Sequence, residues 1–83
     1  MILNETHRKL LGMRTYLNKF AVQVGYDPDS DFMKALEELI QDGYVKKIDT
    51  YFNREIGCIL DVYKLTPEGD VLVLDENIIA VSP

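Results

Sequence analysis

The sequence predicts a single α+β domain over residues 1–83, in which two helices precede a β-hairpin and a short C-terminal helix or strand. Two observations predict this class. Apolar residues recur at spacings of three and four before residue 43, whereas β-branched and aromatic residues dominate residues 44–65. No repeat or linker divides the chain, and 83 residues with 47% apolar content are enough for one small hydrophobic core.

The first predicted element is a long N-terminal helix over about residues 5–24, with Asn4 as its N-cap. Gly12 lies inside this helix, where glycine is less favourable than alanine by about 1 kcal/mol, so two shorter helices are the alternative to one helix with a kink. The apolar stripe passes Gly12 without a change of spacing. It consists of Leu10, Met13, Leu17, Phe20, Ala21 and Val24.

A second helix is predicted over residues 28–42. Asp27 is the expected N-cap, Pro28 fits the first helical position, and Asp29 places negative charge near the positive end of the helix dipole. Gly43 follows as the residue most able to adopt the left-handed conformation that ends a helix. The exposed side of this helix is expected to carry Asp31, Lys34, Glu38 and Gln41.

Residues 44–65 are predicted to form a β-hairpin, with Arg54 near its tip. The second strand is apolar on both faces, so both faces are expected to be partly covered. Cys58, the one cysteine of the chain, lies in this strand and is expected to be a reduced, buried thiol.

The C-terminal region begins with Thr66 and Pro67, which predict a short helix over about residues 67–75, although residues 71–74 would also suit a strand. Eight of the eleven residues from 71 to 81 are apolar. This C-terminal apolar segment is therefore expected either to cover the hairpin or to form the contact of a homodimer.

Two motifs carry a family resemblance: ALEELIQDGYV at residues 35–45 and YKLTPEG at residues 63–69. Together they resemble the winged helix-turn-helix domains of small bacterial, archaeal and phage transcriptional regulators, over about residues 20–70. In such domains a helix ends at a glycine and a two-stranded wing follows. A sequence similar to YKLTPEG ends the wing and begins the next helix. The resemblance implies a recognition-like helix at residues 28–42, a wing at residues 44–65, and Gly25 in the turn before the recognition helix.

The resemblance implies that the chain binds double-stranded DNA as a small transcriptional regulator. The basic residues expected to hold DNA, on the first helix and the wing, are Arg8, Lys9, Lys46, Lys47 and Arg54. The recognition-helix surface departs from the family, because it is acidic where base-reading side chains are expected. It comprises Asp29, Ser30, Asp31, Lys34, Glu38 and Gln41.

The acidic balance of the chain leaves a second hypothesis open. The formal net charge is −5, so the domain repels polyphosphate at long range and any DNA contact depends on local basic clusters. A protein-interaction module that presents its acidic helix to a basic protein partner fits the same composition.

Neither catalysis nor metal binding is expected. His7 has no carboxylate or nucleophile partner by spacing and is expected to be solvated. Asp27, Asp29, Asp31 and Glu38 are spaced like ligands of a calcium loop, but Phe32 occupies the position that needs glycine. We therefore expect no metal and no other cofactor.

No apolar run approaches the roughly 20 residues that a membrane-spanning helix needs. We therefore expect a cytoplasmic protein with no membrane partner.

Overall fold

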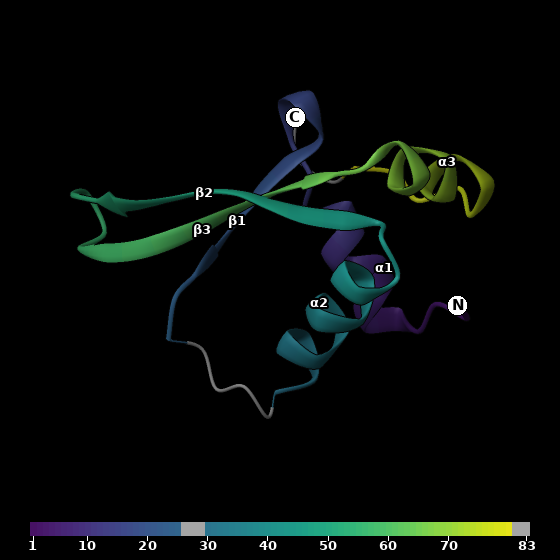
Figure 1. Cartoon of the computed structure of the whole chain (residues 1–83), viewed down its shortest axis with the longest axis horizontal. Helices are drawn as coiled ribbons and strands as arrows, with labels where there is room; N and C mark the ends of the chain where they lie inside the picture. The colour runs from purple at the N-terminus through teal and green to yellow at the C-terminus, as the bar shows by residue number, and fades with distance from the viewer. Residues whose placement is uncertain (26–29, 81–83) are drawn as a thin grey trace.

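The computed structural model describes residues 1–25 and 30–80 as an α+β domain, with helices and an antiparallel sheet (Figure 1). The elements of these residues, in chain order, are α1 (Glu5–Gly12), the short 3-10 helix η1 (Tyr16–Asn18), β1 (Lys19–Gln23), α2 (Asp31–Gln41), β2 (Val45–Asn53), β3 (Cys58–Leu65) and α3 (Pro67–Asp75).

The long N-terminal helix is wrong. α1 ends at Gly12, and residues 19–23 form strand β1 instead of a continuing helix. β1 alternates between buried and solvent-facing residues, with Phe20 and Val22 buried and Ala21 exposed between them. Phe20 and Ala21 had matched the helical spacing, but pairing with β3 decided the outcome because it satisfies the backbone of both strands.

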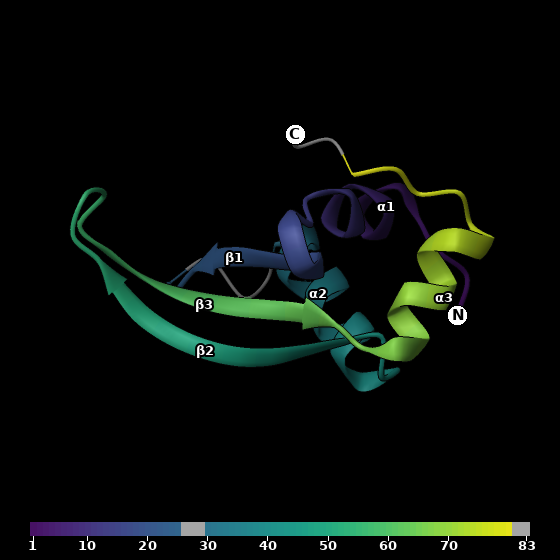
Figure 2. The ribbon, with the colours of Figure 1, turned by 90° about the horizontal axis from the view of Figure 1, so that it is seen from above.

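The sheet has the strand order β1-β3-β2, and both pairings are antiparallel. A hairpin lies where the sequence predicts one, with β2 and β3 joined by a turn that includes Gly57 at a φ of +69°. The register of β2 shifts between Lys47 and Asp49, so a bulge interrupts this strand. Figure 2 shows the end of the hairpin extending well beyond the helices.

Local signals set the ends of α2. Its N-cap is Ser30, whose hydroxyl accepts a hydrogen bond from the Met33 N–H at 3.2 Å. The predicted cap Asp27 and the predicted first residue Pro28 lie outside the described residues. Gly43 ends the helix with a φ of +81°, as predicted. Gly25 also has a positive φ, +101°, but the turn in which it lies follows strand β1.

The C-terminal region forms a helix, α3, over the predicted range, and the strand alternative is wrong. The Thr66 hydroxyl caps it by accepting from the Gly69 N–H at 3.1 Å. A Cβ added to Gly69 would lie 2.1 Å from the Tyr44 carbonyl oxygen, so glycine is required for α3 to approach the start of β2.

α1 and α2 lie on the same side of the sheet, and α3 continues from the end of β3 (Figures 1 and 2). The core fills the space between helices and sheet, and Phe20 stacks on Tyr63 with ring centroids 5.5 Å apart. Its buried members are Leu3, Leu10, Leu11, Phe20, Val22, Ala35, Leu36, Leu39, Val45, Tyr63, Leu65, Val73 and Ile78. None of α1, α2 and α3 covers the opposite face of the sheet, above which the segment that contains η1 rises (Figure 1).

Candidate nucleic-acid interface

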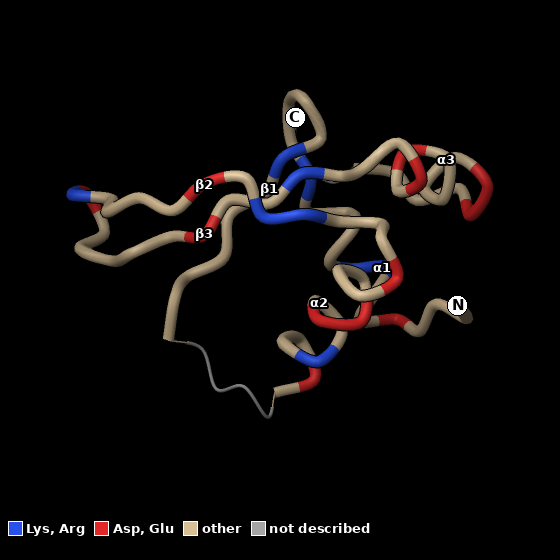
Figure 3. The backbone as a smooth tube through the Cα atoms, in the orientation of Figure 1, with Lys and Arg blue, Asp and Glu red and all other residues tan. Residues whose placement is uncertain are grey.

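Three lysines meet on the face of the sheet that the helices leave open. Lys64 of β3 is directly opposite Lys19 of β1 and directly opposite Lys46 of β2. Directly opposed residues share a face, and the next residues along the strands, Phe20 and Val45, point into the core. Lys19, Lys46 and Lys64, which we call the lysine row, therefore project from the outer face. Figure 3 shows that basic residues of the three strands lie close together along the backbone.

The lysine row makes no ion pair in the described part of the chain. Among the described residues, no Asp or Glu carboxylate lies within 4.0 Å of the ammonium group of Lys19, Lys46 or Lys64. Directly opposed side chains have Cβ atoms about 4.5–5.5 Å apart, and like charges in this position are destabilising. An anionic ligand that binds across the three strands would remove this repulsion.

The expected DNA-binding residues of the hairpin are divided between two places. Lys46 belongs to the lysine row and Lys47 follows it on β2, exposed. Arg54 is exposed in the hairpin turn, at the end of the hairpin farthest from α3 (Figure 3). Asp49 and Asp61 lie between, and Asp61 accepts a hydrogen bond from the Thr50 hydroxyl at 2.7 Å. The positive charge of the hairpin is therefore concentrated where it joins the domain.

The other two expected DNA contacts, Arg8 and Lys9, are not brought to the lysine row. Arg8 Nη1 donates to the Glu76 carbonyl oxygen at 3.2 Å, and its Nη2 lies 3.5 Å from the Glu76 carboxylate. Lys9 Nζ lies 3.9 Å from Glu5, one helical turn earlier. Both residues belong to α1, on the covered side of the sheet, and Arg8 holds the C-terminal segment against this helix.

The expected recognition-helix surface does not gather as one site. Ser30 is the N-cap of α2, while Asp31, Lys34 and Gln41 are exposed along the helix, and Asp29 lies outside the described residues. Glu38 turns toward α1, where it contacts His7 rather than Lys34. Glu37 and Glu38 are also exposed on α2, so the exposed surface of the whole helix is predominantly acidic, which disfavours contact with phosphates.

His7 is buried, at 3% exposed, and the expectation of a solvated side chain is wrong. Its Nδ1 accepts a hydrogen bond from the Asn4 N–H at 3.0 Å, while the Asn4 side chain accepts from the His7 N–H at 2.9 Å, which completes a capping box. Because Nδ1 accepts, the proton of the neutral ring is on Nε2, which donates to Glu38 Oε1 at 3.2 Å. The three-residue spacing from Asn4 was the local signal for this role, whereas Glu38 is 31 residues away.

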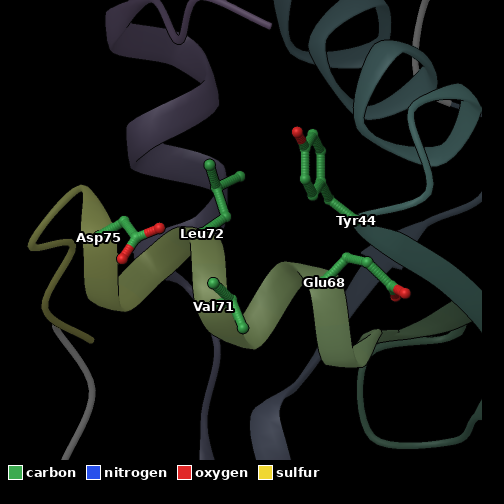
Figure 4. Close-up of a pocket in the computed structure, with 5 residues that line it drawn as sticks. All are labelled: Tyr44, Glu68, Val71, Leu72 and Asp75. Carbon is green, nitrogen blue, oxygen red and sulfur yellow. The ribbon is translucent and has the colours of Figure 1, made fainter.

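A groove of about 320 Å³ lies beside α3, apart from the lysine row (Figure 4). Tyr44, Val71 and Leu72 supply its apolar surface, and Glu68 and Asp75 stand toward the two ends of α3. The groove can accept an apolar side chain of a ligand, and Glu68 and Asp75 can contact basic residues of the same ligand.

Other candidate groups show no site chemistry. Cys58 is half-buried rather than buried, and its thiol donates to the Ile56 carbonyl oxygen at 3.4 Å. In residues 1–25 and 30–80, no three His, Cys, Asp or Glu side chains are placed to hold a metal ion, and Asp27 and Asp29 lie outside this part. Nor does the described chain contain a helix of the length and apolarity that crossing a membrane requires.

Comparisons with models of known protein families, with curated proteins and with solved structures give no match to this chain. The candidate site therefore depends on the geometry of the chain itself.

The lysine row could not be found from the sequence because the predicted helix included Lys19. The available signal was the alternation of residues 19–23, in which polar Lys19 and Gln23 lie two positions from exposed Ala21. The register that brings Lys19 opposite Lys64 is a tertiary property, since 45 positions separate the two residues.

Proposed function

We propose that this chain is a small DNA-binding regulator that contacts the phosphate backbone through the lysine row. The observation that carries the proposal is the convergence of Lys19, Lys46 and Lys64 on one open sheet face without an acidic partner among the described residues. The arrangement of helices, three-stranded sheet and hairpin is compatible with a winged-helix fold, which agrees with the resemblance of the two sequence motifs.

The proposed contact is with the backbone and not with base edges. Lysine binds phosphate as a point charge, and phosphate contacts position a protein without reading sequence. The acidic exposed surface of α2 gives no support for reading the major groove, so we propose that binding is largely independent of sequence. Three phosphate contacts correspond to a slope of about −2.7 in the logarithm of affinity against the logarithm of salt concentration.

The test is fluorescence anisotropy of a labelled random-sequence duplex between about 50 and 200 mM salt, the range over which such contacts weaken strongly. The variant is the double substitution Lys46→Gln/Lys64→Gln. The matched control is Lys9→Gln/Lys34→Gln, which removes the same charge from helices on the other side of the sheet.

We expect the row variant to lose at least tenfold in affinity at low salt, and its salt slope to fall by about 1.8 because two phosphate contacts are gone. We expect the control variant to bind within about twofold of the unaltered protein, because exposed charges beyond a Debye length of about 10 Å are largely screened. Equal losses in both variants would mean that net charge alone matters, and absence of binding by the unaltered protein would exclude the function.

A second candidate function is the binding of a basic protein segment at the α3 groove. It is favoured by the apolar surface of Tyr44, Val71 and Leu72 between Glu68 and Asp75. A helix with apolar anchors flanked by lysine or arginine matches such a groove in shape and charge.

Titration with a labelled amphipathic peptide of leucine and lysine tests this second function. Val71→Glu separates the two contributions, since it blocks the apolar groove while adding negative charge. Weaker binding by the variant supports docking in the groove. Tighter binding would show that the peptide responds only to the acidic charge and would exclude the groove.

A further inference from the structure

The segment that leads into the lysine row has an unusual backbone and an exposed aromatic ring. The φ angles of Leu17 and Asn18, in η1, are +64° and +56°. This left-handed backbone conformation is uncommon for residues other than glycine. Tyr16 is 86% exposed and Leu17 is 54% exposed. Such a backbone persists only where the surrounding structure holds it.

Four hydrogen bonds hold this turn. The Thr15 N–H and hydroxyl both donate to the Lys19 carbonyl oxygen, at 2.7 and 3.0 Å, and the Asn18 N–H donates to the Thr15 carbonyl oxygen at 3.0 Å. The Asn18 side chain donates to Asp70 Oδ1 of α3 at 2.8 Å. The turn is thereby closed at its base and fixed to the domain without any contribution from the Tyr16 ring.

The Tyr16 side chain makes no aromatic or hydrogen-bond contact in the described part of the chain. Its ring belongs to no aromatic pair and its hydroxyl makes no hydrogen bond within residues 1–25 and 30–80. A large aromatic surface is thus held in water on a hydrogen-bonded turn, which is unfavourable for an apolar ring.

The turn and the lysine row occupy the same side of the sheet. η1 is followed directly by Lys19, and Figure 1 shows the segment before β1 rising on the side of the sheet opposite α2. Phosphates bound at the lysine row would bring the adjoining bases within reach of this turn.

We propose that the domain binds nucleic acid at an unpaired base, with Tyr16 stacking on the base while the lysine row holds the neighbouring phosphates. The proposal rests on the proposed function. Bases in a duplex are stacked on each other and offer no free face, whereas aromatic side chains stack on the bases of single strands without reading their sequence. The ligand is accordingly a single strand or an unpaired stretch within a duplex.

The experiment measures anisotropy with labelled oligothymidine, a duplex of equal length, and an oligonucleotide of abasic sites that keeps the phosphates but has no bases. Tyr16→Ala removes the ring and Tyr16→Phe retains it. Phe52→Ala is the matched control, because Phe52 is an exposed aromatic residue, at 60%, paired with Ile59 on the other face of the hairpin.

We expect Tyr16→Ala to weaken oligothymidine binding by about 5- to 150-fold, the range expected for the loss of one stacked base. Binding to the duplex and to the abasic strand should change less than twofold, and Tyr16→Phe and Phe52→Ala should bind like the unaltered protein. A melting curve checks that Tyr16→Ala is folded, which its exposure predicts.

Two failures are distinguishable. If Tyr16→Ala binds oligothymidine normally, or loses affinity equally for all three ligands, base stacking is excluded while phosphate binding stands. If Lys46→Gln/Lys64→Gln binds all three ligands as well as the unaltered protein does, the lysine row is not the site and both proposals are excluded.

Discussion

Replacement of His7 by alanine is expected to destabilise the domain strongly, although His7 lies in the first turn of an eight-residue helix. The imidazole accepts from the Asn4 N–H, donates to Glu38, and fills a buried position between α1 and α2. The substitution removes all three contributions, and they differ in size.

The largest contribution is the buried volume. Large-to-small substitutions at buried sites cost about 2–5 kcal/mol, and the lower end applies here because the site lies at the end of a helix next to solvent. Loss of half the capping box adds up to about 1 kcal/mol. The Glu38 contact adds little, since the Glu38 side chain is 55% exposed and exposed pairs contribute about 0–1 kcal/mol.

We therefore expect His7→Ala to lower the free energy of unfolding by about 2–3 kcal/mol, a large part of the roughly 4–12 kcal/mol typical of a chain this size. The melting temperature should fall by about 10–20 °C. Asn4→Ala, which removes the reciprocal cap, should cost about 1 kcal/mol.

Thermal and urea unfolding of His7→Ala, Glu38→Ala and the double variant, followed by circular dichroism, measure these terms. The double-mutant cycle should give a coupling below about 0.5 kcal/mol, because the contact between His7 and the exposed Glu38 side chain is a minor term. The buried volume of His7 is not the main contribution if Glu38→Ala is destabilised as much as His7→Ala, or if His7→Ala is destabilised by less than about 1 kcal/mol.

Three other substitutions test different parts of the structure. Gly69→Ala should destabilise the domain by about 1–3 kcal/mol in urea unfolding, because its Cβ would clash with the Tyr44 carbonyl oxygen; Gly12→Ala, whose Cβ would lie 3.5 Å from its nearest neighbour, is the control and should be neutral or stabilising. Burial, reinforced by a nearby aspartate, raises the pKa of Tyr63 above the ordinary 10.0, so the folded state holds the phenol proton more tightly than the unfolded state. The stability that this group contributes is therefore fully present below pH 10 and is lost as the pH rises further. Above pH 10 the melting temperature should fall less steeply with pH for Tyr63→Phe than for the unaltered protein, and equal slopes would contradict this account. Leu74 is 79% exposed on α3, so Leu74→Asp should reduce self-association measured by light scattering if the C-terminal apolar segment forms a homodimer, while a monomer in both proteins would exclude that contact.

Much of the fold was predicted from local sequence signals, and the structure has the helix ends that these signals predict. Gly43 ends α2 with a positive φ, and Thr66 with Pro67 begins α3. Asn4 caps α1 as predicted. Each of these depends on a few neighbouring residues, through a cap that satisfies free N–H groups or a backbone conformation that glycine tolerates.

The N-terminal region shows where local reasoning failed. Residues 13–24 carry apolar side chains at spacings that suit a helix, and the alternation of Phe20 and Val22 suits a strand equally well. Asn18 is a residue type that tolerates the left-handed conformation and was a weak signal for a turn, whereas left-handed Leu17 carries no such signal. The choice between helix and strand depended on β3, which offers β1 a complete set of backbone partners.

The sequence by itself determined an α+β domain with a glycine-ended helix, a hairpin after it and a C-terminal element that begins at Thr66 and Pro67, while the structure decided that this element is a helix. Only the tertiary structure decided that Lys19 joins Lys46 and Lys64 on one sheet face, and that His7 meets Glu38. The physical reason is distance along the chain: caps and turns are contacts between near neighbours, whereas strand register and helix packing join residues that the chain must bring together by folding.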